Sequence, residues 1–159
     1  MVIAAATKTK PLQISRHYDA SREQIFAAWT NPDALGKWFG PPSHQCKIDK
    51  MDVREGGEYQ IRMIPTGEDG DCGGDCSRDS VCGGRFVELL SPERIVMTFS
   101  WLENGSDIGE TTLTIDLAEA GTGTDLVLTH TGLPDEEAVK AHNGGWNGSL
   151  NGLQSFLQA

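Results

Sequence analysis

The sequence predicts an α+β domain in which a curved antiparallel sheet of about six or seven strands wraps around one long C-terminal helix. Three observations predict it: segments with an apolar side chain at every second residue, short turns between them, and a final segment with helical periodicity. Short turns favour antiparallel hairpins over parallel strands joined by crossover helices. We expect an N-terminal tail over residues 1–10 and a single domain over residues 11–159, a length that suits one hydrophobic core.

The N-terminal part of the domain predicts one strand followed by two short helices. Residues 12–18 alternate between apolar and polar side chains, which is the period of a strand. Ser21 and Gln24 then have the spacing of a capping box, which marks the start of a helix. Asn31 before Pro32 marks a second helix start, because Asn is a good N-cap and Pro is tolerated at the first helical position.

The middle of the chain, from residue 45 to residue 130, predicts six further strands. The clearest alternation is at Tyr59, Ile61 and Met63, and it recurs over residues 95–101. Turn residues such as Gly and Pro separate the candidates. Six strands joined in this way form an antiparallel meander.

The segment from Pro134 onward predicts one long helix. Its core-facing positions recur at steps of three and four, and they are Val139, His142, Trp146, Ser149, Leu150, Leu153 and Leu157. The same segment holds four glycines, each of which costs about 1 kcal/mol relative to Ala in a helix interior, so packing must hold the helix in place. Gly144 and Gly148 are expected opposite Trp146, either as a solvent-facing surface or as a stripe that lets another chain approach closely.

The composition excludes several classes of partner. A net charge of −10 without clusters of Lys and Arg argues against nucleic acid and anionic membranes, and no apolar run reaches the ~18 residues of a membrane-spanning helix. The first eleven residues lack the charged-then-apolar order of a secretory signal, so we expect a cytoplasmic protein without membrane insertion. We expect a monomer or a weak homodimer.

Six short segments in order give the chain a resemblance to a known family. They are residues 19–29 (DASREQIFAAW), 37–41 (KWFGP), 52–59 (DVREGGEY), 84–94 (GRFVELLSPER), 129–133 (THTGL), and Gly145-Trp146 followed by Leu150, Leu153 and Leu157. With these segments the chain resembles the bacterial proteins similar to the C-terminal domain of the activator of the ninety-kilodalton heat-shock protein ATPase (AHSA-like). That family lies within the START-like (SRPBCC) superfamily, and the resemblance covers Ile14 to Leu157.

The resemblance implies a helix-grip fold with a groove between the long helix and the sheet, which holds hydrophobic small molecules in many superfamily members. Together with the alternation of the strands, it gives a set of candidate ligand-binding residues: Trp29, Trp38, Tyr59, Ile61, Met63, Met97, Phe99, Trp101, Leu128, His130, His142, Trp146 and Leu150. The preferred function is binding of an unidentified hydrophobic small molecule or lipid. The alternative is a chaperone-cofactor-like interaction module, with a chaperone as the partner.

A third hypothesis is an enzyme that uses the cavity, but no catalytic residue is assigned. His130 and His142 are placed to present an imidazole to the pocket, and equally suit a histidine whose hydrogen bonds are satisfied within the protein. The sequence holds no nucleophile elbow, zinc-protease pair, phosphate loop or dinucleotide fingerprint. We therefore expect no cofactor and lean against an enzyme.

The most individual segment is the acidic, glycine-rich stretch that carries Cys72, Cys76 and Cys82. Three hypotheses stay open for it: a metal site, a labile Cys72–Cys76 or Cys72–Cys82 disulfide, or a solvated loop. The spacing lacks the paired Cys-x2-Cys of a structural zinc site. Cys46, which alternates with Ile48, is expected to be buried and inert.

Overall fold

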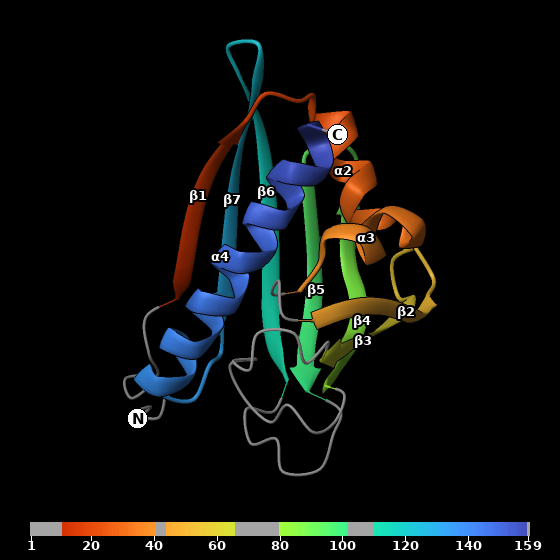
Figure 1. Cartoon of the computed structure of the whole chain (residues 1–159), viewed down its shortest axis with the longest axis vertical. Coiled ribbons are helices and arrows are strands. Elements are labelled where there is room, and N and C mark those ends of the chain that lie inside the picture. The colour runs from red at the N-terminus through yellow and green to blue at the C-terminus, as the bar shows by residue number, and fades with distance from the viewer. Residues whose placement is uncertain (1–10, 41–43, 66–79, 102–109, 159) are drawn as a thin grey trace.

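The computed structural model describes residues 11–40, 44–65, 80–101 and 110–158, and these residues form seven strands and three helices (Figure 1). In chain order the elements are β1 (Leu12–Tyr18), α2 (Arg22–Thr30), α3 (Pro32–Trp38), β2 (His44–Met51), β3 (Glu58–Pro65), β4 (Ser80–Leu90), β5 (Arg94–Trp101), β6 (Thr111–Ala120), β7 (Gly123–Thr131) and α4 (Glu136–Gln158). The predicted order of one strand, two short helices, a six-strand meander and a long helix is confirmed.

The described strands form one antiparallel sheet in the order β1-β7-β6-β5-β4-β3-β2. Strands β2 to β7 each pair with their neighbour in the chain, whereas β1 pairs with β7, with Leu12 opposite His130. Two register shifts, between Ile48 and Lys50 and between Phe86 and Glu88, interrupt the ladders. Such bulges bend and twist a strand, which favours a curved sheet over a flat one.

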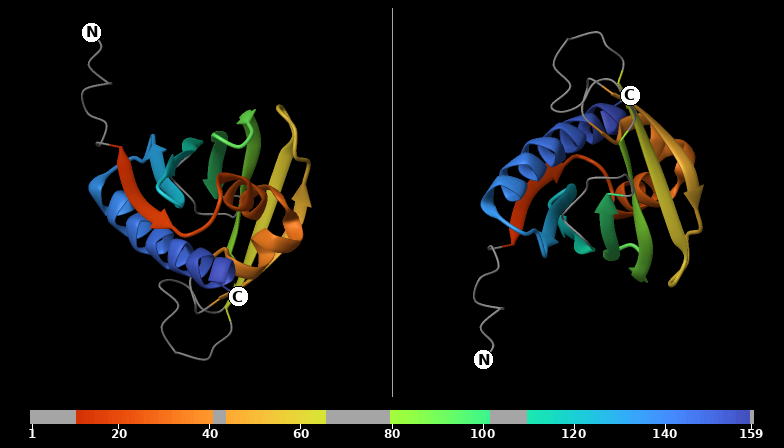
Figure 2. Two further views of the ribbon diagram at one scale, coloured as in Figure 1. Left: turned by 90° about the horizontal axis from the view of Figure 1, so that it is seen from above. Right: turned by 90° about the horizontal axis from the view of Figure 1, so that it is seen from below.

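The helices lie on the concave face of this sheet (Figures 1 and 2). Helix α4 crosses the face diagonally and contacts β1 at one edge, while α3 contacts β2 at the other edge. Both short helices begin as predicted: Ser21 and Gln24 form the capping box of α2, and the Asn31 side chain accepts hydrogen bonds at the start of α3. None of the helices in the described residues has the length and hydropathy needed to cross a bilayer.

One continuous hydrophobic core fills the space between the sheet and the helices. The strands contribute every second residue to it, as in β6, where Leu113, Ile115 and Leu117 are buried. Helix α4 contributes Trp146 and Leu150, among others. The alternation predicted from the sequence therefore identifies the buried face correctly.

Hydrogen bonds fasten α4 along its length. The Tyr18 hydroxyl donates to the carbonyl oxygen of Leu150 at 3.0 Å, and the Gly40 backbone N–H donates to the Ser149 hydroxyl at 3.0 Å. The Arg16 guanidinium on β1 donates to the side-chain oxygens of Asn147 and Asn151 on α4, at 2.6 and 2.8 Å. These bonds join the helix to β1 and to the end of α3.

The helix glycines do not all have the same surroundings. Gly144 faces open space, as expected, whereas Gly148 is half-buried and lines a surface groove. A Cβ added to Gly152 would lie 2.6 Å from the carbonyl oxygen of Trp38, so only glycine lets α4 approach α3 this closely. The end of α3 and β2 border the same groove, so the surface at Gly148 is not fully open to solvent.

Candidate functional site

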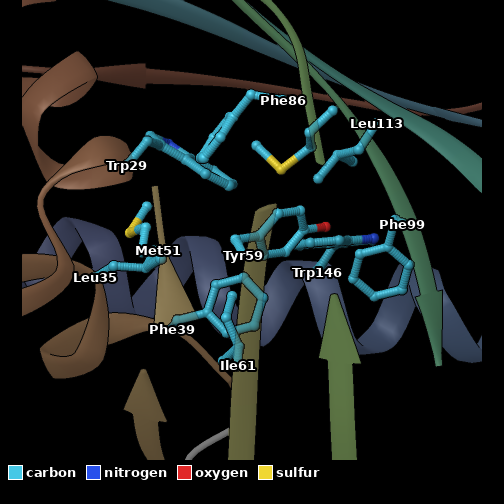
Figure 3. A pocket seen from close by; sticks show the side chains of 11 residues that line it. Trp29, Leu35, Phe39, Met51, Tyr59, Ile61, Phe86, Phe99, Leu113 and Trp146 are labelled. Carbon is cyan, nitrogen blue, oxygen red and sulfur yellow. The ribbon is translucent and has the colours of Figure 1, made fainter. Parts of the chain in front are cut away.

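A small cavity lies at the centre of the core, where α2, α3, α4 and the sheet meet (Figure 3). Its lining is Trp29, Leu35, Phe39, Met51, Tyr59, Ile61, Phe86, Met97, Phe99, Leu113 and Trp146. The cavity has a volume of about 10 Å³, which is room for about one water molecule. The side chains converge from eight parts of the chain, so the cavity exists only in the folded protein.

Aromatic rings form much of the wall on the helix side. The ring of Trp29 packs edge-on against Trp38, with 4.8 Å between centroids, and lies 6.4 Å from Trp146. Trp146 also contacts Phe39 and Phe99 at 5.6 and 5.7 Å. Offset and edge-to-face rings at these separations are favourable arrangements. Trp146 is therefore the aromatic residue that joins α4 to both the short helices and the sheet.

Two polar groups of the lining differ in their hydrogen bonding. The Tyr59 hydroxyl donates to the carbonyl oxygen of Thr98 at 2.7 Å, and burial raises the pKa of Tyr59 well above its ordinary value. The indole Nε1 of Trp29 is buried, and none of the residues that the structure describes accepts a hydrogen bond from it. The cavity wall is thus mainly apolar and aromatic.

His130 lies behind the cavity wall, in a chain of hydrogen bonds that runs from Trp146 through His130 and Thr111 to the carbonyl oxygen of Phe99. The Thr111 hydroxyl donates to the carbonyl oxygen of Phe99 at 2.7 Å, so its oxygen must accept the bond from His130 Nε2–H, also 2.7 Å long. Trp146 Nε1–H donates to His130 Nδ1 at 3.1 Å. These partners fix the neutral tautomer with the proton on Nε2. Burial lowers the pKa of His130 to about 3, and electrostatic repulsion from His142 makes a smaller contribution in the same direction.

His142, which lies one turn before Trp146 on α4, takes part in a second chain of hydrogen bonds. Its Nδ1–H donates to the carbonyl oxygen of Ala138 at 2.7 Å, and its Nε2 accepts the indole N–H of Trp101 at 3.1 Å. The two imidazole rings lie edge to face, 5.3 Å apart. All four ring nitrogens are occupied by protein partners, which is the arrangement of structural histidines and leaves no free lone pair for a general base.

The structure brings six of the predicted ligand-binding residues together around the cavity: Trp29, Tyr59, Ile61, Met97, Phe99 and Trp146. Trp101, His130 and His142 instead form the hydrogen-bond chains, and Trp38 packs behind Trp29. The other three predicted residues are buried but do not line the cavity, and they are Met63, Leu128 and Leu150.

Sequence reasoning missed five residues of the lining: Leu35, Phe39, Met51, Phe86 and Leu113. Leu35, Phe39 and Leu113 lie at apolar positions of a predicted helix or strand, whereas Met51 and Phe86 were not singled out by periodicity. Periodicity does not say which core side chains border a void, because the void depends on how side chains from distant elements meet.

A second, wider depression lies at the surface between α3, β2 and the C-terminal half of α4. It measures about 930 Å³, and polar and apolar residues share its lining, among them Lys37, Gln45, Cys46, Asn151 and Phe156. Phe39 borders both this depression and the central cavity, and Trp38, one of the predicted ligand-binding residues, lines the depression.

The cysteine prediction falls partly outside the described residues, which include neither Cys72 nor Cys76. Cys82 is fully buried within β4, opposite Ile61 of β3. The described residues contain no cluster of three or more His, Cys, Asp or Glu side chains that could hold a metal ion. Cys46 is half-buried and burial raises its pKa to about 12, which keeps it a protonated thiol.

Comparison with known proteins agrees with the architecture. A protein from Chromobacterium violaceum, CV1439, has a TM-score of 0.82 and 29% identity, over 94% of this chain and 97% of that one. The AHSA1 protein of Silicibacter pomeroyi has a TM-score of 0.79 and 22% identity, over 94% and 98%. CalU16 from Micromonospora echinospora has a TM-score of 0.65 and 23% identity, over 92% and 74%.

The family assignment comes from the sequence itself. The search of curated proteins gives no match. Residues 19–158 match the model of the family described as activator of Hsp90 ATPase homolog 1-like protein. Because this match runs from the end of β1 to the end of α4, the chain belongs to the activator of Hsp90 ATPase homolog 1-like family, within the START-like (SRPBCC) superfamily.

Proposed function

We propose that this chain binds a small hydrophobic molecule or lipid between the sheet and α4. The observation that carries the proposal is the cavity itself: an apolar and aromatic wall drawn from both short helices, the sheet and the long helix. Ligand sites in proteins combine a mostly apolar lining with few placed polar groups. The position between helix and sheet is the one that the helix-grip fold offers.

The cavity must enlarge before it can hold such a ligand. Pockets for small molecules usually measure about 300–1,000 Å³, far above the void of about 10 Å³. Two features support an enlargement. Met51 and Met97 border the void, and unbranched thioether side chains change rotamer readily. Helix α4 forms the wall with Trp146, and its glycines weaken it as an isolated helix.

Native mass spectrometry of the freshly purified protein, followed by a dye-displacement titration with medium-chain ketones, alcohols and fatty acids, tests the proposal. We expect retained or added ligand mass at one molecule per chain. Leu113→Phe fills the void and should weaken uptake at least ten-fold. Leu90→Phe makes the same change at a side chain that is 49% exposed, and should leave uptake unchanged. Absence of any bound molecule and of any displaceable dye in the wild-type protein would refute the proposal.

The chaperone-cofactor-like function is the second candidate, and the family description supports it. Its test is the ATPase rate of a purified Hsp90-type chaperone at increasing concentrations of this chain. A saturable change in rate that Leu113→Phe preserves would favour this function over ligand binding. We also propose a cytoplasmic monomer or weak homodimer, and the same native mass spectrum reports the oligomeric state.

A further inference from the structure

Phe39, the residue that follows α3, borders two hollows of the molecule. The central cavity and the wide surface depression between α3, β2 and the C-terminal half of α4 both include Phe39 in their lining, and it is the one described residue that they share. Its ring is directed toward the cavity (Figure 3), whereas its chain neighbours Trp38 and Gly40 line the depression. Phe39 therefore lies in the wall between the buried cavity and the surface.

The depression offers space into which the Phe39 ring can turn. It measures about 930 Å³, and four of the described residues in its lining are glycines without side chains: Gly36, Gly40, Gly148 and Gly152. Gly36 lies one turn before Phe39 on α3, and Gly40 directly follows it. A side chain changes direction by moving between staggered rotamers about χ1. Such a rotation toward the depression would vacate the place of the ring in the cavity wall.

Weak interactions keep the Phe39 ring in the cavity wall. The ring packs edge-on against Trp146 with 5.6 Å between centroids, and lies 5.8 Å from the ring of Trp38. The backbone N–H of Gly40 donates to the Ser149 hydroxyl at 3.0 Å, which ties the chain next to Phe39 to α4. Two ring contacts and one neutral hydrogen bond are individually weak, so the ring can leave the wall without unfolding either helix.

We propose that ligands enter and leave the central cavity through the surface depression, and that the Phe39 side chain is the gate between the two. The inference rests on the proposed function, because it gives the route to the same cavity. Movement of α4 sets the volume of the cavity, whereas Phe39 controls access to it. A change that loosens the gate without altering the lining raises the association and dissociation rates together and leaves the affinity unchanged.

The first experiment compares two variants that remove the same side chain from the cavity lining. Phe39→Ala also opens the wall toward the depression, whereas Phe99 lines the cavity but not the depression. Stopped-flow fluorescence of the neutral dye N-phenyl-1-naphthylamine measures the association rate constant. We expect Phe39→Ala to raise it about ten-fold or more, and Phe99→Ala to change it by less than about three-fold. Similar rates in the two variants would overturn the inference, because cavity volume alone would then explain them.

The second experiment uses a milder pair of variants, each of which removes one hydrogen bond of α4. Ser149→Ala takes the acceptor from the Gly40 N–H beside the gate, and Tyr18→Phe removes the bond to the carbonyl oxygen of Leu150. Mixing the dye complex with excess 2-nonanone gives the dissociation rate constant. We expect Ser149→Ala to raise both rate constants about five-fold at constant affinity, and Tyr18→Phe to leave both unchanged.

The outcomes separate the gate from the proposed function. Rate constants that Tyr18→Phe raises as much as Ser149→Ala, or that neither variant changes, would overturn the inference and leave ligand binding intact. A change in affinity without a change in association rate in Ser149→Ala would also overturn it. Absence of any bound dye or displacing ketone in the wild-type protein would overturn both the proposed function and the gate.

Discussion

At the scale of single residues, the two histidines show how a polar group in the core acquires a structural role. The sequence placed His130 on the buried face of its strand, and the structure confirms that position. Whether a buried imidazole is satisfied or free depends on partners from other elements, here Thr111 on β6 and Trp146 on α4. Because these partners come from distant parts of the chain, the local sequence around His130 does not distinguish an imidazole that is free to contact a ligand from one that is satisfied within the protein.

The neutral state of His130 predicts a pH dependence of stability. The unfolded chain protonates this imidazole near pH 6.5, whereas the folded protein resists protonation down to about pH 3. The unfolded state then binds more protons between these values, so stability falls as the pH falls through this window. From pH 7 to pH 5 the loss attributable to His130 is about 2 kcal/mol. Urea unfolding at both pH values measures it.

Two variants isolate the contribution of His130. His130→Gln does not titrate, so its free energy of unfolding should change less between pH 7 and pH 5 than that of the wild type. His17 is the opposite case, because its hydrogen bond with Asp125 raises the pKa of this exposed side chain. Its contribution is present at low pH and is lost as the pH rises through the folded pKa, so His17→Gln should steepen the acid-side loss. An identical pH profile for His130→Gln and the wild type would contradict the neutral, buried state.

At the scale of elements, local signals predicted the starts of helices and the strands well. A capping box and an Asn-Pro pair act within four residues of chain, and both appear as hydrogen bonds at the starts of α2 and α3. The faces of α4 were harder to predict. A helical wheel separates Gly148 from Trp146, but it does not show that the end of α3 and β2 border the far side of the helix.

The glycines of α4 give a matched pair of substitutions with opposite expected effects. Gly144→Ala adds a methyl group in open space and should stabilise the protein by about 0.5–1 kcal/mol, through helix propensity. Gly152→Ala places a Cβ 2.6 Å from the carbonyl oxygen of Trp38, and should destabilise it by about 1–3 kcal/mol because backbone must move. Thermal or urea unfolding of both variants measures the difference. Two stabilised variants would show that α4 and α3 are not tightly apposed at Gly152.

At the scale of the whole molecule, the sequence predicts the layer of helices on a curved sheet, because alternation, short turns and one long amphipathic segment leave few other arrangements. The size of the cavity did not follow from the same reasoning. It depends on side chains from eight parts of the chain, and a shift of about one methyl group in any of them changes a void of about 10 Å³ completely. Sequence thus identified the pocket wall in part and left its volume open.

Enlargement of this void requires one layer to move against the other, and α4 is the layer built to move. It is held by side-chain hydrogen bonds and by the buried side chains of Trp146, Leu150 and Leu153, whereas β6 and β7 are hydrogen-bonded through their backbone to a strand on each side. We therefore predict that amides of residues 143–152 exchange with solvent faster than those of β6 and β7, and that saturating 2-nonanone slows them selectively. Hydrogen exchange read by mass spectrometry or NMR measures both rates.

Arg16→Met removes the guanidinium that bonds Asn147 and Asn151, and should speed exchange in α4 while leaving β6 unchanged. Slow exchange throughout residues 143–152 in the ligand-free protein would mean that α4 opens only with global unfolding, and a ligand would then have to enter by another route.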